Sequence, residues 1–191
     1  MADFVRTRMT TKEYAALPES NQPMELIYGE IVILPSPKDD HQKLSMRLSN
    51  RIFNHIDQNN LGEMRVAPTD VYLDDEEDVV VQPDIFFIAR DNQQCRLEAD
   101  NYWHGSPDLC VEIVSPGSGK RDRVTKFDLY EKYGVREYWI VEPEERYVVV
   151  YVLDNGTYKR QGAYDETQPL SSTVLTGLTL NLAEVFPAKE V

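Results

Sequence analysis

Short apolar runs separated by polar turns occupy most of the chain, and three stretches with helical periodicity lie between them. The run MELIYGEIVILP has two apolar halves around Tyr28-Gly29, which predicts a hairpin. Further strands are expected in the runs MRVAPTDVYL, VVVQPDIFFIA, PDLCVEIV, EYWIV and YVVVYVL. The turn at Asp154-Asn155-Gly156 predicts a second hairpin, which leads into TYKRQGAY.

Two of the helical stretches precede most of these strands. Thr10 to Leu17 predicts a short helix, with Thr10 or Thr11 as its N-cap. A longer helix is expected from about His41 to Gln58, with its N-cap supplied by Asp39 or Asp40. Its apolar residues recur at every fourth position on one stripe, which should face the core: Leu44, Leu48, Ile52 and Ile56.

A basic stripe with the same spacing runs beside that apolar one and comprises Lys43, Arg47 and Arg51. It is either a solvated helix face or a ridge that contacts phosphates.

The third helix is expected from about Arg121 to Tyr133, with Gly134 just beyond its end. Its predicted core stripe is Val124, Phe127 and Tyr130.

The order of elements predicts an α/β protein with a mixed central sheet flanked by helices. At 191 residues the chain fits one domain, residues 1–191. We expect a loop from Asp91 to Gly105, and short strands with one helical turn from Ser171 to Phe186. No apolar run approaches the ~20 residues that span a bilayer. The N-terminus has no apolar core of a signal peptide, so we expect a cytoplasmic protein without membrane contact.

Composition limits the kinds of site that are plausible. The net charge of −13 opposes nonspecific binding to nucleic acid, because phosphate contacts dominate that affinity. A local basic face or docking through a metal ion would be needed to overcome it. The two cysteines, Cys95 and Cys110, have no CxxC spacing, so a structural zinc site or disulfide framework is not expected.

The candidate chemistry starts from Glu112, in the middle of a strand that is apolar on both faces. A carboxylate buried there must be paired, protonated or bound to a metal, and the residues alone leave these three alternatives open. Asp84 follows Pro83, which we expect at a strand start or bulge because proline cannot donate to a sheet ladder. Asp84 could equally be a simple turn residue, and Lys126 a solvated helical lysine.

Asp84 and Glu112 at the ends of neighbouring strands could hold Mg²⁺, which prefers oxygen ligands and keeps several waters. Lys126 nearby could orient the attacking water or stabilise charge on phosphate. Asp108 shares the strand face of Glu112 but lies four residues away, ~13 Å along the strand at ~3.3 Å per residue. That separation is too large for both carboxylates to share one ion.

Two other reaction classes are disfavoured by spacing. Ser115 lacks the GxSxG elbow of a nucleophile, and no histidine follows it in the chain. The GSGK segment lacks the GxxxxGK[ST] spacing of a phosphate loop.

With these residues in hand, the chain resembles the PD-(D/E)XK nuclease superfamily, and within it the Uma-type endonuclease branch. The matching segments are MELIYGEIV, the helix from His41, QPDIFFIA, and the run from Pro107 to Pro143 with the hairpin after it. The resemblance implies a restriction-endonuclease-like core. It also implies that Asp84 is the aspartate of the PD element, Glu112 the acid of the (D/E)XK element and Glu25 an additional acidic residue.

The usual lysine two residues after the acid is Val114 here, so the simple motif is broken. By the resemblance, its role passes to Lys126 on the following helix, with Asp122 as a helper. His41 matches a position that is often histidine in this branch, where it could contact phosphate or cap its helix.

The function expected from residues and resemblance together is metal-dependent hydrolysis of phosphodiester bonds by a DNA endonuclease with Mg²⁺ or Mn²⁺. Asp84 and Glu112, together with Glu25, are the expected metal and catalytic carboxylates, Lys126 is the expected catalytic lysine, and substrate contacts are assigned to His41 and Asp122. The alternative is an inactive nuclease-fold module that serves protein interaction or a mobile element. The partner expected is nucleic acid, and a homodimer is one arrangement left open, with YVVVYVL as a sheet edge or a covered face.

Overall fold

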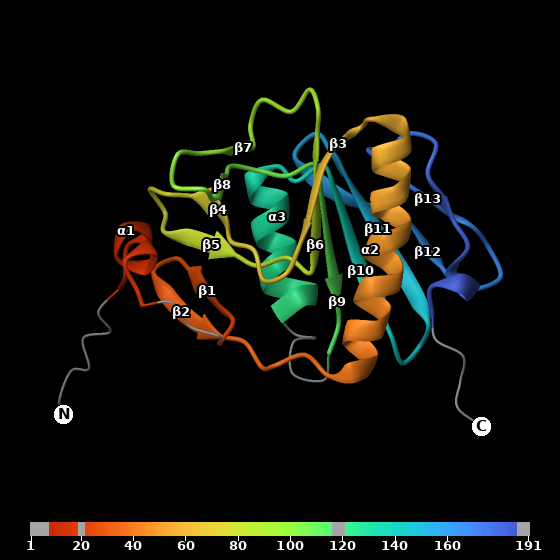
Figure 1. The fold of residues 1–191 in the computed structure, drawn as a ribbon, viewed down its shortest axis with the longest axis horizontal. Coiled ribbons are helices and arrows are strands. Elements are labelled where there is room, and N and C mark those ends of the chain that lie inside the picture. The colour runs from red at the N-terminus through yellow and green to blue at the C-terminus, as the bar shows by residue number, and fades with distance from the viewer. Residues whose placement is uncertain (1–7, 19–21, 116–120, 187–191) are drawn as a thin grey trace.

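The computed structural model describes residues 8–18, 22–115 and 121–186, and the side chains of residues 121 and 122 lie outside that description. Two mixed six-stranded sheets form the body of the protein, and a long helix crosses one of them (Figure 1). The chain is therefore mixed α/β, but its described residues form two six-stranded sheets and a small two-stranded one where one central sheet was expected.

Sheet I has the strand order β2-β1-β5-β4-β8-β7 and lies toward the N-terminal side of the molecule (Figure 1). The predicted N-terminal hairpin forms two of its strands. Val71 of β4 pairs in parallel with Trp103 of β8, and the other strand pairs are antiparallel. Its strands are β1 (Met24–Ile27), β2 (Glu30–Ile33), β4 (Val71–Asp74), β5 (Val79–Val81), β7 (Arg96–Leu97) and β8 (Trp103–His104).

Sheet II has the order β12-β11-β10-β9-β6-β3. Its strands β9 and β10 are parallel and are joined through the third helical segment, while all other pairs are antiparallel. Its strands are β3 (Gly62–Val66), β6 (Ile85–Ala89), β9 (Leu109–Ile113), β10 (Glu137–Glu142), β11 (Tyr147–Asp154) and β12 (Thr157–Tyr164). The run YVVVYVL lies in β11, between two other strands, which excludes the sheet edge, one of the two placements left open for it.

The helices cover opposite faces of sheet II (Figure 1). The apolar stripe of α2 (Asp39–Asn59) packs on one face, together with the C-terminal segment that contains β13 (Leu170–Ser171), β14 (Thr179–Leu180) and η2 (Leu182–Glu184). On the other face, α3 (Phe127–Tyr133) and residues of sheet I form a second core. Every residue of β9 is buried, as predicted for a strand covered on both faces.

Several element boundaries differ from the sequence prediction. The runs MRVAPTDVYL and VVVQPDIFFIA each divide into two strands that belong to different sheets. The first division contains a cis Ala67-Pro68 bond, and the second contains Pro83, which removes a ladder donor. The predicted loop after residue 90 contributes β7 and β8. Helix α2 starts at Asp39, so Lys38 is the N-cap, and the aspartates lie in the first turn.

The short helix α1 (Thr11–Ala15) begins as predicted. Thr10 is its N-cap, and the Glu13 backbone N–H donates to the Thr10 side chain while the Glu13 carboxylate accepts from the Thr10 backbone. This reciprocal pair satisfies two backbone donors at the start of the helix.

The third helical stretch is not one regular α-helix. Its first part, η1 (Arg121–Lys126), is π-helical, and α3 continues it to the left-handed cap at Gly134. The looser turn changes which side chains face inward. Val124, predicted for the core, is 51% exposed, whereas Lys126 is buried.

The basic stripe of α2 faces other parts of the chain. Lys43 pairs with Asp39, Arg47 donates to the Phe186 carbonyl, and Arg51 pairs with Glu184. Two of the three cations are thus used to hold the C-terminal segment, which does not favour a phosphate-contacting ridge. In the described part of the chain, no helix is long and apolar enough to cross a membrane.

Candidate functional site

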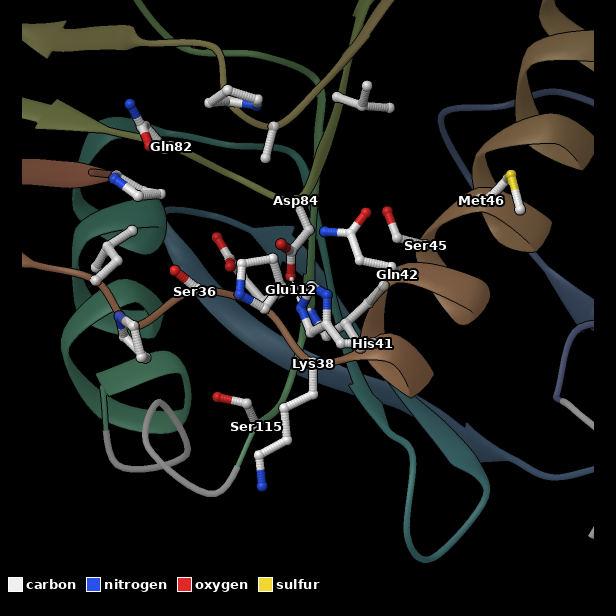
Figure 2. A pocket seen from close by; sticks show the side chains of 18 of the residues that line it. Ser36, Lys38, His41, Gln42, Ser45, Met46, Gln82, Asp84, Glu112 and Ser115 are labelled. Atoms are coloured by element: carbon white, nitrogen blue, oxygen red, sulfur yellow. Dashed lines mark hydrogen bonds and ion pairs between the residues drawn. The ribbon is translucent and has the colours of Figure 1, made fainter. Parts of the chain in front are cut away.

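A pocket of about 510 Å³ opens where β6 begins and β9 ends, between the N-terminal turns of α2 and the segment that follows β2 (Figure 2). It brings together residues from six separate parts of the sequence. Among its lining residues are four of the predicted site residues: His41, Asp84, Glu112 and Lys126.

The two candidate carboxylates meet because of the register between β6 and β9. Ile85 is paired with Val111 in this antiparallel ladder. One residue further along, Asp84 stands opposite Glu112, a position at which side chains are close neighbours. The Ile113 backbone N–H donates to Asp84 Oδ2 at 2.7 Å, which fixes that carboxylate at the strand end. Asp84 therefore does more than initiate a turn.

Glu112 forms a buried ion cluster with Lys126 and Glu25. Lys126 Nζ lies 2.7 Å from Oε1 of each carboxylate, and the exposed fractions of the three residues are 4% or less. Of the alternatives left open for Glu112, the structure shows the ion pair, and its partner is the candidate lysine itself. Removing one member of such a cluster would leave an uncompensated buried charge.

Tyr130 completes the surroundings of Glu112. It lies one turn after Lys126, and its hydroxyl donates to Glu112 Oε1 at 2.7 Å. Burial, reinforced by the negative charge of Glu112, raises the pKa of Tyr130 well above its ordinary value. The hydroxyl therefore stays protonated and holds the carboxylate as a hydrogen-bond donor.

The backbone between the two sheets contributes to the same cluster. Gln82 donates its N–H to Glu25 Oε1 at 2.9 Å, and its carbonyl accepts from Lys126 at 3.4 Å. The pKa of Asp70 is raised, mainly because the carboxyl is buried. A hydrogen bond from Gln82 lowers this pKa, and the negative charge of Glu25 raises it further. Within the described residues, Lys126 therefore contacts two carboxylates, Glu25 and Glu112.

His41 connects the pocket to the long helix. Its Nε2 lies 3.2 Å from Asp84 Oδ2, and both side chains are mostly covered. Figure 2 shows the side chains of Gln42 and Ser45 projecting from α2 on the pocket side of Asp84. Their contribution was not foreseen, because nothing in the sequence pattern places the first turns of α2 beside the start of β6.

Other predicted residues lie elsewhere. Glu25 contacts Lys126 but is not among the residues that line the pocket. Asp108 is buried away from the pocket, where it accepts from the Ala89 backbone and pairs with Arg136 at 2.8 Å. Asp122 falls outside the described side chains. Tyr130 was assigned only to the core, and its spacing of four residues from Lys126 is the signal that could have identified it.

The floor of the pocket has a donor set that suits a hard divalent cation. Asp84 and Glu112 face it from adjacent strands, and Mg²⁺ is commonly held by one or two carboxylates with water and substrate oxygens completing its shell. Within the described residues, no group of three or more His, Cys, Asp or Glu side chains is arranged to hold an ion by itself. Asp84 and Glu112 are the carboxylates among the described lining residues of the pocket.

Comparison with known proteins agrees with the sequence resemblance. A family model described as "Uma2: Putative restriction endonuclease" matches residues 11–183. A solved structure from Anabaena variabilis, described as a putative nuclease belonging to DUF820, superposes with a TM-score of 0.74 at 20% sequence identity. The alignment covers 93% of this chain and 97% of that one. No match was found among curated proteins.

Proposed function

The chain belongs to the Uma2 family, described as "Putative restriction endonuclease", and from this premise we propose that it is a metal-dependent nuclease with a restriction-endonuclease-like core. The observation that supports the proposal best is the convergence of Asp84, Glu112 and Lys126 on the floor of one pocket. Asp84 and Lys126 are 42 positions apart in the sequence. The register of β6 with β9 and the π-helical turn bring all three residues together.

Asp84 and Glu112 would hold Mg²⁺ or Mn²⁺. When bound, the ion would acidify a water molecule and neutralise charge on the scissile phosphate. The Ile113 N–H orients Asp84, and the Tyr130 hydroxyl orients Glu112, so both carboxylates are fixed before any ligand enters. Such preorganisation is what a catalytic site requires of its supporting contacts.

Lys126 would position the attacking water or stabilise the charge that develops on the phosphate. Lys126 lines the pocket, and its ammonium is held by Glu25, which does not line the pocket itself. Glu25 would thus be a positioning residue for Lys126. This arrangement lets a helical lysine serve the pocket although Val114 occupies the usual lysine position.

One observation favours a second candidate, the inactive nuclease-fold module. Lys126 is engaged by two carboxylates and is only 1% exposed, so it could be a structural cation that neutralises Glu25 and Glu112. In that case the pocket would bind neither metal nor phosphate.

The test combines a metal-binding readout with an activity readout. Thermal unfolding of wild type is measured with and without Mn²⁺, and cleavage is measured on supercoiled plasmid and on single-stranded DNA. Asp84→Asn keeps a hydrogen-bond acceptor for Ile113 but removes the charge, so both the metal-induced rise in Tm and cleavage should be lost. Asp108→Asn is the matched control, because it alters a buried carboxylate outside the pocket and should keep the response to metal.

Well-folded wild type whose Tm is unaffected by Mn²⁺ and which cuts neither substrate would support the inactive module. A Tm response that persists in Asp84→Asn would show that metal binds elsewhere in the chain.

A further inference from the structure

The walls of the pocket differ in chemistry from its floor. Apart from its charged residues and His41, the lining is mainly apolar and rich in proline, including Leu34, Pro35, Met46, Val66 and Pro68. Uncharged hydrogen-bonding groups such as Gln42, Ser45 and Ser49 alternate with these residues. Apolar contacts with neutral donors and acceptors suit a nucleobase, which hydrogen-bonds along its edges, better than a charged phosphate backbone.

The charged residues of the pocket also favour contact with a base over contact with many phosphates. Within the described residues that line the pocket, the lysines are Lys126, held in its ion cluster, and Lys38 at the rim. Figure 2 shows the Lys38 side chain extending past Ser115 away from Asp84, where it could meet one phosphate. Duplex binding usually depends on many phosphate contacts, and the net charge of −13 opposes it.

The depth of the floor adds a steric argument. The side chains of Asp84 and Glu112 are only 17% and 5% exposed. A phosphodiester of a regular duplex resting on the surface would stay above them, because its base pair could not follow it into a pocket of about 510 Å³. A single unpaired nucleotide could enter this space with its phosphate first.

We propose that the pocket takes an unpaired nucleotide, so that the substrate class is single-stranded nucleic acid or an unpaired position within a duplex. This inference rests on the proposed nuclease function and specifies its substrate. The base lies against Met46, Val66 and the prolines Pro35 and Pro68. The adjacent phosphate reaches Asp84 and Glu112.

The experiment measures binding apart from cleavage. Fluorescence anisotropy compares a labelled 12-nucleotide single strand with its blunt duplex and with the same duplex carrying one bulged nucleotide. Ca²⁺ replaces Mg²⁺ so that binding is measured without cleavage, because Ca²⁺ also takes oxygen ligands but with a different geometry. We expect the single strand and the bulged duplex to bind at least tenfold more tightly than the blunt duplex.

A gain-of-contact variant tests the wall itself. Met46 is 67% exposed, so Met46→Trp should fold normally and add an aromatic surface for the base. It should tighten single-strand binding about fivefold, in the lower part of the range for stacking of one base. Phe53→Trp is the matched control on the same helix, exposed but outside this pocket, and should leave binding unchanged.

Equal or tighter binding of the blunt duplex, or equal effects of the two tryptophan variants, would overturn the inference. Cleavage of blunt duplex without binding of single strands would overturn the inference about the substrate and leave the nuclease proposal intact. Conversely, single-strand binding that Met46→Trp strengthens, with no cleavage of any substrate, would support the inference about the ligand and reject the nuclease.

Discussion

Replacing Lys126 by methionine should destabilise the protein severely, because it removes the cation shared by two buried carboxylates. Methionine has a similar length and leaves no large cavity, so the main change is electrostatic. Glu25 and Glu112 are 0% and 4% exposed, and without Lys126 they would be neighbouring buried charges. Breaking a buried pair in this way typically costs about 3–5 kcal/mol. That is a large part of the ~5–15 kcal/mol that stabilises a domain.

Urea denaturation at neutral pH measures this loss directly. With an m-value of about 2 kcal/mol/M, the transition midpoint of Lys126→Met should fall by roughly 2 M. The double variant Glu25→Gln/Lys126→Met removes one of the two buried carboxylate charges of the cluster and leaves Glu112 with the Tyr130 hydroxyl. It should recover at least ~1 kcal/mol relative to Lys126→Met alone, since contacting residues do not contribute additively.

A midpoint shift below roughly 0.5 M for Lys126→Met, with an unchanged m-value, would refute the reasoning. It would mean that the carboxylates are not held as buried ions that depend on this lysine. The fold would then tolerate loss of Lys126, and a marked loss of cleavage in the same variant would point to a purely catalytic role.

Two further predictions concern single hydrogen-bonding groups. Tyr130→Phe removes the donor to Glu112 and should cost about 1–3 kcal/mol in urea denaturation, and an unchanged midpoint would show that the hydroxyl contributes nothing. His104 is the second case: burial lowers its pKa, but hydrogen bonds to Asp75 and Asp100 outweigh this effect, and its pKa is raised above 6.5. The stability it contributes is therefore fully present below pH ~6.5 and is lost as pH rises through the folded value. Midpoints of wild type and His104→Gln should differ most at acid pH and converge at alkaline pH, and a constant difference would contradict this assignment.

The sequence was sufficient where local patterns decide structure. The four-residue spacing of Leu44, Leu48, Ile52 and Ile56 identified the buried stripe of α2, and the Tyr28-Gly29 turn identified the first hairpin. The all-apolar surroundings of Glu112 identified a buried carboxylate before any partner was known. These features depend on neighbours in the chain, so one sequence can indicate them.

What remained hidden depends on contacts between distant segments. Nothing near Glu25 in the sequence indicates that it meets Lys126, a hundred and one positions later, because sheet I must first be assembled beside α3. The sequence also could not predict that VVVQPDIFFIA divides between two sheets, because each half is apolar enough to be a buried strand of either sheet. Val124 was placed in the core by an α-helical period that the π-helical turn does not follow.

Because of that π-helical turn, the position of Lys126 depends on the number of residues in η1. Each residue of a regular α-helix rotates the chain by ~100°, so loss of one residue from η1 would turn the Lys126 ammonium away from Glu25 and Glu112. A change of length there would leave the composition of the helix nearly intact and yet separate Lys126 from Glu112. Across relatives of this chain, the spacing from the strand acid to the helical lysine should therefore vary less than the residues that lie between them.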